Sequence, residues 1–446
     1  MYQGKNFSER ASIFIKLLLP VLVYQVISYS SGMIGTFMAG HYSPTDLAGV
    51  SMGVNIWNPI MYTLNAIVLA LIPIVSQLIG KNKEEEIPTV VRQFLYIAVI
   101  ISIILIIGLN TLATPIVDRL GMDSNIAEIT KNYLFYESFG VLSIFLYVVL
   151  RSFIDSLGLT RLSMIMMIVS VPVNVFFAYS FIFGKFGMPE LGGAGAGLGT
   201  SLAYWVLLGI SILVLFKQER LKALHLEKRI PLNIDKIKEG VRLGLPIGGT
   251  VFAEVAIFSV VGLIMAKFSS LIIASHQSAM NFSSLMYAFP MSISSAMAIV
   301  VSYEVGAKRF EDAKIYARLG RITALIFAGF TLSFLYIFRD RVASLYGNDP
   351  QFIETTAVFL TYSLFFQLAD TFAAPLQGIL RGYKDTIVPF YLGLIGYWGV
   401  AIPLGYLLDQ ATDLGAFAYW IGLIASLIVS GCLYQWRLKS IMKRLS

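Results

Sequence analysis

Long apolar runs separated by short polar segments form the main pattern along the chain. A helix of roughly 20 residues crosses the hydrocarbon core of a bilayer, because each residue adds about 1.5 Å. The runs therefore predict twelve membrane-spanning helices, near residues 14–39, 46–72, 93–116, 132–156, 161–184, 193–216, 243–267, 272–302, 320–338, 354–380, 386–408 and 414–436. An even number of spans places both termini on the same side of the membrane.

Composition supports this interpretation. Of the 446 residues, 57% are hydrophobic and 13% are charged, whereas a soluble protein has roughly 45–50% apolar and about 25% charged residues. This excludes an ordinary soluble enzyme and predicts an all-α polytopic membrane protein. The run 17–39 is too long for a signal peptide and should remain as the first span. The single cysteine, Cys432, leaves no disulfide and no thiolate metal site.

Lys and Arg are distributed unevenly between the two sides of the predicted topology. Of the 33, 27 fall on the side of the termini and of the loop 217–242, and six fall on the opposite side. The positive-inside rule therefore predicts cytoplasmic termini. The basic residues are spread among loops rather than gathered into a patch, so no nucleic-acid partner is expected.

An internal repeat appears at a constant offset of 226 residues. The stretch VSQLIGKNKEEE (75–86) aligns without a gap with VSYEVGAKRFED (301–312). We expect an N-terminal six-helix lobe over 1–216, a cytoplasmic linker loop over 217–242 and a C-terminal six-helix lobe over 243–446. Six spans per copy give both copies one orientation, and transporters built from such parallel repeats place their site between the halves.

Two acidic residues lie in the middle of predicted spans: Glu254 in 243–267 and Asp370 in 354–380. A carboxylate near the bilayer centre costs about 2.5–3.5 kcal/mol, and every Lys and Arg falls in a loop or near a span end. These acids are therefore expected to be protonated, to share protons with polar neighbours, or to bind a cation such as Na⁺. The alternative is a neutral acid that is hydrogen-bonded inside the bundle.

Other polar residues inside spans allow two interpretations. The amides Asn174 and Asn281 either form interhelical hydrogen bonds or line a cavity. Glu137 is expected within one or two turns of the outer end of the span 132–156, where water can reach it. At the repeat offset, the partners of Asp370 and Glu254 are Ile144 and Ser28, which places the mid-span acids in the second half only.

Motifs for enzymatic chemistry are missing from the sequence. The glycine-rich run at 192–201 lacks the Gly-Lys-Ser/Thr ending of a phosphate-binding loop and fits close helix packing instead. The chain has three histidines and no His-Glu-x-x-His motif. We therefore expect neither an enzyme nor an ATP-driven pump, and no cofactor other than a coupling ion, Na⁺ or H⁺.

Four stretches carry a resemblance to a known family. The chain resembles the multidrug and toxic compound extrusion (MATE) transporters, and most closely their NorM-type branch, over essentially its full length. The matching stretches are MAGHYSPTDLAGVSMGVNIWNP (38–59), GKFGMPELGGAGAG (184–197), ASHQSAMNFSSLMYAFPMSISSA (274–296) and LQGILRGYKDT (376–386).

The resemblance implies two six-helix bundles that face a central cavity, and efflux of organic cations driven by inward Na⁺ or H⁺. It gives Glu254 and Asp370 the role of binding the coupling cation. Asn174 resembles a position that lines the cavity of the first lobe, and Asn281 and Phe366 are further candidates for the substrate cavity. Many relatives have an aspartate where this chain has Gly35, and the NorM type can have a tyrosine where this chain has Phe366.

The sequence thus favours a secondary multidrug antiporter of the cell membrane that exports lipophilic cations by alternating access. We expect a monomer with Na⁺ as the coupling ion and H⁺ as its competitor, because carboxylates, amides and carbonyls suit a hard cation. Two alternatives stay open. One is a lipid-linked precursor flippase, which would require basic residues in its cavity, and the other is a non-transporting membrane scaffold.

Overall fold

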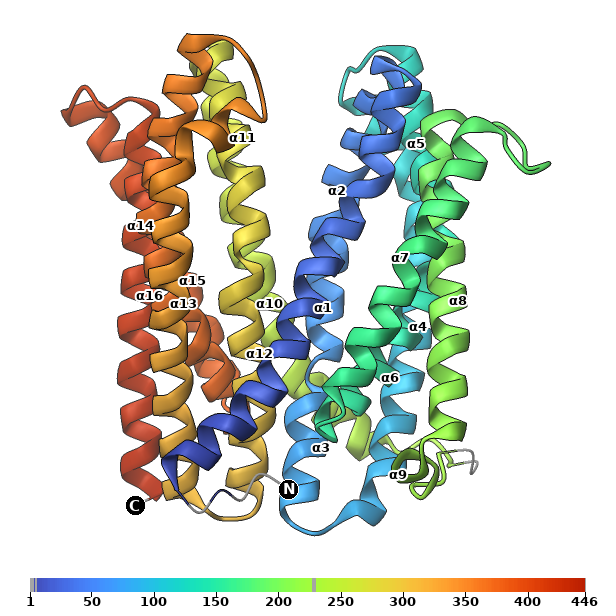
Figure 1. Cartoon of the computed structure of the whole chain (residues 1–446), viewed down its shortest axis with the longest axis vertical. Helices are drawn as coiled ribbons and strands as arrows, with labels where there is room; N and C mark the ends of the chain where they lie inside the picture. The colour runs from blue at the N-terminus through green and yellow to red at the C-terminus, as the bar shows by residue number, and fades with distance from the viewer. Residues whose placement is uncertain (1–3, 5, 227–229, 446) are drawn as a thin grey trace. The chain divides into compact units, whose positions relative to one another are not determined.

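The computed structural model describes residue 4, residues 6–226 and residues 230–445. In this part of the chain, 11 helices are long and apolar enough to cross a membrane, and a bent pair of helices brings the number to 12. The prediction of an all-α polytopic protein is thereby confirmed. Figure 1 labels the helices along the chain.

The first six spans include both continuous and interrupted helices. Spans two and four each consist of two helices, and the other four are continuous. The helices are α1 (Phe7–Tyr42), α2 (Pro44–Val68), α3 (Leu71–Gly80), α4 (Ile87–Arg119), α5 (Ser124–Ser138), α6 (Val141–Ser156), α7 (Thr160–Phe183) and α8 (Gly195–Lys217), with the short elements η1 (Glu84–Glu86), η2 (Gly192–Ala194) and α9 (Glu219–Lys222).

The second six spans differ from the first at the fourth span, where α14 is a single continuous helix. Their helices are α10 (Ile234–Ile264), α11 (Ser270–Met286), α12 (Ala288–Gly306), α13 (Phe310–Ser344), α14 (Pro350–Gly382), α15 (Ile387–Ala411) and α16 (Ala416–Leu445), with η3 (Met265–Lys267) after α10. The pair α11 and α12 forms one broken span, as α2 and α3 do in the first half.

Contacts within the chain define two compact units. The N-terminal unit comprises residues 26–248, and the C-terminal unit comprises the described residues of 1–25 and 249–446. The first part of α1 therefore belongs to the C-terminal unit, and the first part of α10 belongs to the N-terminal unit.

In the N-terminal unit, α2 and α5 approach closely because α2 presents glycines to α5. A Cβ atom at Gly49 would lie 2.5 Å from Cγ2 of Ile129, and Gly53 packs against the ring of Tyr133. Thr130 Oγ1 donates a hydrogen bond to the carbonyl oxygen of Gly49 at 2.9 Å. Small residues at such positions let helix backbones come together inside a membrane protein.

In the C-terminal unit, a buried aromatic cluster joins α11, α14, α15 and α16. Trp420, Phe359 and Tyr397 are at most 1% exposed. Trp420 Nε1 donates a hydrogen bond to His276 Nδ1 at 3.0 Å, which satisfies two buried polar atoms and connects α16 to α11. His276 is thus a hydrogen-bonded interior residue of this cluster.

The close packing of α12 against α14 generates a prediction about stability. A Cβ atom at Gly378 would collide with the backbone of Ser294, whereas a Cβ atom at Gly329 would meet nothing within 4 Å. We expect Gly378→Ala to lower the free energy of unfolding by about 1–3 kcal/mol, as overpacked cores do. Gly329→Ala is the matched control. Thermal unfolding midpoints of the purified proteins test this, and equal midpoints for the two variants would contradict it.

Candidate functional site

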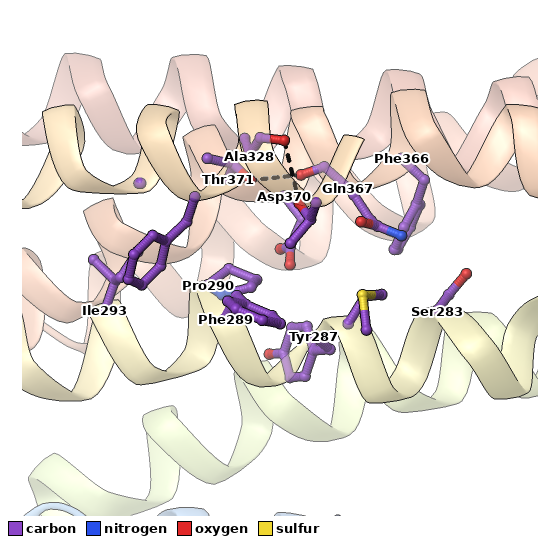
Figure 2. Close-up of a pocket in the computed structure, with 14 residues that line it drawn as sticks. Ser283, Tyr287, Phe289, Pro290, Ile293, Ala328, Phe366, Gln367, Asp370 and Thr371 are labelled. Atoms are coloured by element: carbon purple, nitrogen blue, oxygen red, sulfur yellow. Dashed lines mark hydrogen bonds between the residues drawn. The ribbon is translucent and has the colours of Figure 1, made fainter. Parts of the chain in front are cut away.

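Asp370 lies inside the C-terminal unit, twenty residues along α14 from Pro350. The helix start is fixed by Asp349, whose Oδ2 accepts a hydrogen bond from the Phe352 amide at 2.9 Å. Asp370 is 4% exposed. Figure 2 shows its side chain facing the residues at the junction of α11 and α12, among them Tyr287 and Pro290.

A small cavity adjoins Asp370. Its lining comes from α11, α12, α13 and α14, and it includes Ser283, Tyr287, Phe366 and Gln367. The cavity volume is about 20 Å³, and a water molecule requires roughly 10–15 Å³ by the same measure. The cavity therefore accommodates one water molecule or one small ion, and it is too small for an organic cation.

A minority of the residues that line this cavity carry side-chain oxygens, and some of these are already hydrogen-bonded within α14. Thr371 Oγ1 donates a hydrogen bond to the Gln367 carbonyl oxygen at 2.8 Å, and Gln367 Nε2 donates to Ser363 Oγ at 3.3 Å. Pro375 lies four residues after Thr371, so the Thr371 carbonyl cannot receive its usual helix hydrogen bond. Carboxylate, amide and carbonyl oxygens are ligands that hard cations prefer.

Glu254 lies on α10 and is 6% exposed. Trp398 Nε1 on α15 donates a hydrogen bond to the Ala253 carbonyl oxygen at 3.1 Å and thereby holds this part of α10. The side chains of Tyr287 and Gln377 lie close to the Glu254 carboxylate and act on it. Tyr287 also lines the Asp370 cavity, so a single side chain contacts one acid and borders the cavity of the other.

The two predicted acids lie close enough for their charges to interact. Glu254 comes from α10 and Asp370 from α14, and both belong to the C-terminal unit. Two neighbouring carboxylates repel each other when both are ionised, so a proton or a bound cation stabilises the pair. The structure thus brings together the two residues that the sequence placed at mid-span.

Arg381 changes the expectation that no cation lies near these acids. It is near the end of α14, as the sequence indicated, yet it is 9% exposed and its charge acts on Glu254. Arg381 Nη2 donates a hydrogen bond to Gln377 Oε1 at 3.2 Å, and Gln377 Nε2 donates to Tyr397 Oη at 3.0 Å. A buried guanidinium therefore lies within electrostatic range of Glu254.

Phe366 and Asn281, which were also predicted for the substrate cavity, lie at different places in the C-terminal unit. Phe366 borders the Asp370 cavity and packs edge-on against Phe258, with ring centroids 5.5 Å apart. Asn281 is exposed on α11, and its Oδ1 accepts a hydrogen bond from Tyr346 Oη at 3.0 Å. Asn281 is not part of the cavity lining at Asp370.

Asn174 lines a separate cavity in the N-terminal unit. This cavity has a volume of about 60 Å³ and is bordered by α1, α7 and α8. Asn174 Nδ2 donates a hydrogen bond to Ser31 Oγ at 3.2 Å. Ser28, the repeat partner of Glu254, also borders it. The lining residues that the structure describes here carry hydroxyl and amide groups but no carboxylate.

Glu137 is not at a solvated helix end, so that expectation was wrong. It is 1% exposed and lies thirteen residues after Ser124, beside the 49° bend between α5 and α6. The predicted span began at residue 132 because the polar segment before it lowers the hydropathy, but the helix begins at Ser124. Glu137 is therefore about 20 Å along the helix from its start.

Sequence reasoning also missed Tyr287 and Gln377. Both lie within stretches that carried the family resemblance, but nothing in a one-dimensional pattern indicates that they contact Glu254. In the described residues, no group of three or more His, Cys, Asp or Glu side chains could hold a metal ion. The chemistry at Glu254 and Asp370 is that of a carboxyl pair with neighbouring neutral oxygens.

These features define a class of protein. The chain is a multi-pass membrane protein with an internal six-span repeat, and it carries buried carboxyl groups inside one unit. Ionisable residues within membrane spans mark ion or substrate pathways, and paired repeats are the common architecture of secondary transporters. The fold and the site are those of a membrane transporter.

Comparison with known proteins identifies the family. The MatE family model matches residues 20–180 and residues 246–407. A "Probable multidrug resistance protein NorM" of Streptococcus pneumoniae (strain ATCC BAA-255 / R6) is 67% identical over 444 residues, covering 100% of this chain and 98% of that protein. A protein of the same name from Bacillus subtilis (strain 168) is 42% identical over 452 residues, covering 100% of this chain and 99% of that protein.

Solved structures agree on the fold. The eukaryotic MATE transporter AtDTX14 superimposes with a TM-score of 0.87 at 16% identity, covering 99% of this chain and 100% of that chain. An outward-facing multidrug resistance MATE family transporter of the MOP superfamily gives a TM-score of 0.84 at 15% identity, covering 97% of each chain. The chain belongs to the MATE family of transporters. The two matched segments begin 226 residues apart, which is the repeat offset in the sequence.

The packing at Gly35 generates a prediction about introducing the aspartate that the family resemblance implies for this position. A Cβ atom at Gly35 would lie 2.8 Å from Cβ of Ala196 on α8, so a side chain at this position collides with its neighbour. We expect Gly35→Asp to lower the thermal unfolding midpoint and Gly35→Asp combined with Ala196→Gly to recover part of the loss. Thermal unfolding of the purified variants measures both. A single variant as stable as the wild type would show that α1 and α8 separate easily.

Proposed function

We propose that this transporter is a secondary active multidrug efflux antiporter, which exports lipophilic organic cations in exchange for inward Na⁺ or H⁺. The observation that carries the proposal is the interacting pair of buried carboxyls, Glu254 and Asp370, beside a cavity sized for one water or ion. The relatives named as multidrug resistance proteins support the substrate class.

Antiport requires that the two acids do not bind the ion and the drug favourably at the same time. When a cation or protons neutralise the carboxyl pair, the attraction for a positively charged drug is lost. When the drug is bound, its charge replaces that of the ion. A difference of 1–3 kcal/mol between the two states is typical of coupling between binding sites.

Na⁺ is the proposed coupling ion, with H⁺ as a competitor. The carboxylates of Glu254 and Asp370, the hydroxyl and amide groups nearby and the Thr371 carbonyl can surround a hard monovalent cation. Protons compete for the same carboxylates. In this scheme Glu254 and Asp370 are the Na⁺ ligands, and Asn174, Asn281 and Phe366 contact the drug.

The arrangement in the cell follows from the charge distribution and the repeat. We propose a monomer in the cell membrane. In this proposal both termini lie in the cytoplasm, because 27 of the 33 Lys and Arg fall on the side of the termini. The protein would consist of the lobes 1–216 and 243–446, joined by the loop 217–242. Movement of the lobes would open the drug-binding site alternately to the two sides of the membrane.

The alternatives have less support. A flippase for lipid-linked precursors handles a pyrophosphate group, yet among the described residues neither of the two cavity linings contains Lys or Arg. A membrane scaffold gives no reason for two interacting carboxyls to be buried in one unit, since their burial costs free energy without contributing to packing.

Asp370 provides a direct test of the proposal. Asp370→Asn keeps the size and the polar character of the side chain but cannot exchange charge, so we expect normal folding and loss of gradient-driven ethidium efflux from vesicles. Asp340→Asn is the matched control, because that side chain is 76% exposed on α13. Wild-type efflux by Asp370→Asn would refute a coupling role for this residue.

The ion is tested separately. We expect Na⁺, added at fixed pH to purified protein loaded with a fluorescent cationic drug, to release the drug, and K⁺ at the same concentration to release little. Glu254→Gln should reduce the Na⁺ effect because one charged ligand is lost. If K⁺ and Na⁺ act alike while a fall in pH alone releases the drug, H⁺ is the coupling ion instead.

A further inference from the structure

Glu137 is a buried acid that the proposed coupling site does not include. It lies on α5 in the N-terminal unit, next to the bend that joins α5 to α6. Its side chain is almost fully enclosed, with 1% of its surface exposed. An acid inside a membrane span is a functional candidate by default, because burying its charge is costly.

The two carboxyl oxygens of Glu137 have different surroundings. Oε1 accepts a hydrogen bond from Tyr133 Oη at 2.8 Å. Oε2 is buried and has no partner among the residues that the structure describes. An ionised carboxylate would leave negative charge on that oxygen without a donor, whereas a neutral acid leaves one O–H group unpaired, at about 1–3 kcal/mol. The geometry therefore suits a protonated carboxyl with its C=O at Oε1.

The neighbouring helices enclose this carboxyl with small residues. Gly197 on α8 faces it: a Cβ atom there would lie 3.3 Å from Glu137 Cγ and 2.7 Å from the Tyr133 carbonyl oxygen. On α2, Gly53 packs against the Tyr133 ring. A side chain at either position would displace the pair, so the sequence leaves space for the acid rather than filling it.

Three charged side chains on α5 and its neighbouring elements have partners other than Glu137. Asp46, near the start of α2, accepts hydrogen bonds at Oδ1 from the Gly193 amide of η2 and at Oδ2 from Ser43 Oγ, both at 2.5 Å. On the remaining neighbour, α4, Asp118 forms an ion pair with Lys131 of α5. Asp46 is thus held by neutral donors, and Asp118 and Lys131 pair with each other.

Asn110 is a further polar residue of α4 that contacts α5. Its Nδ2 donates a hydrogen bond to Ser138 Oγ at 3.4 Å, one residue beyond Glu137. Within the described chain, Tyr133 is therefore the titratable side chain that contacts the Glu137 carboxyl. A change in the protonation of Glu137 would be opposed or assisted chiefly by this phenol.

The repeat places Glu137 in a meaningful position. At the offset of 226 its partner is Ser363 on α14, seven residues before Asp370. Seven residues are about two helical turns, so the two positions lie on nearly the same face of a helix. Both units therefore carry a buried acid on their fourth span. This corrects the expectation that such acids belong to the second half only.

We propose that Glu137 is a proton-binding site of the N-terminal unit, separate from Glu254 and Asp370. The carboxyl holds a proton on Oε2 in this conformation. When water reaches Oε2, the O–H bond breaks, the proton passes to water, and a carboxylate remains to which Tyr133 donates. The effect of this site on efflux rests on the proposed transport function, but its protonation does not.

Infrared spectroscopy of the purified full-length protein tests the proton directly. We expect Glu137→Gln to remove a band of a protonated carboxyl at neutral pH, and Glu128→Gln, an exposed site on the same helix, to leave it. Tyr133→Phe should shift the band, because the C=O loses its hydrogen bond, while keeping the acid. Loss of an ionised carboxylate band in Glu137→Gln would overturn the proposal.

Exchange is measured by transferring the wild-type protein into D₂O. We expect the Glu137 band to move as its proton is replaced by deuterium, and we expect Glu137→Gln to change the pH profile of ethidium efflux where Glu128→Gln does not. A band that never moves, or an unchanged pH profile in an active Glu137→Gln variant, would make Glu137 a static structural acid. If the wild type shows no efflux, the transport proposal fails, and the D₂O shift still decides on proton exchange.

Discussion

The cost of placing charge in a bilayer is the constraint on which the interior of this transporter depends. An unpaired carboxylate at mid-membrane costs about 2.5–3.5 kcal/mol. Glu254 and Asp370 have different surroundings that lower this cost. Glu254 is surrounded by Tyr287, Gln377 and the buried Arg381. Asp370 faces a cavity with neutral oxygens. These surroundings hold the two acids inside the protein, and in the proposed antiport both acids exchange a charge.

The duplicated scaffold carries unequal chemistry in its two copies. Both units use broken spans and glycine contacts to bring helices together. The described cavity of the N-terminal unit, however, is lined by neutral groups around Asn174, and that of the C-terminal unit includes Asp370. Helix packing depends on residue size, which the repeat preserves. Charge at individual positions is free to diverge, and in the proposed antiport the C-terminal half alone binds the coupling ion at Glu254 and Asp370.

Sequence patterns predicted the spans, the repeat and the two central acids, because hydropathy and depth along a helix are one-dimensional properties. The predicted depth of Glu137 in the membrane was wrong, since polar residues after Ser124 lowered the hydropathy at the true start of the helix. The contacts that individual side chains make were harder to predict than their depth. Arg381 was correctly placed near a helix end, yet whether such a residue points into solvent or into the bundle depends on neighbouring helices. Asn281 is exposed, and this too depends on how the neighbouring helices are arranged.

The size of the Asp370 cavity limits how an ion and a drug can compete. About 20 Å³ is enough for a water molecule or a small ion, whereas pockets that enclose drug-sized molecules measure roughly 300–1,000 Å³. Drug and ion therefore cannot compete for the same volume in this conformation. In the proposed antiport, they compete for the negative charge of Glu254 and Asp370, which acts beyond the cavity wall. Charge competition of this kind tolerates drugs of many shapes, because it requires a positive charge nearby rather than a close steric fit.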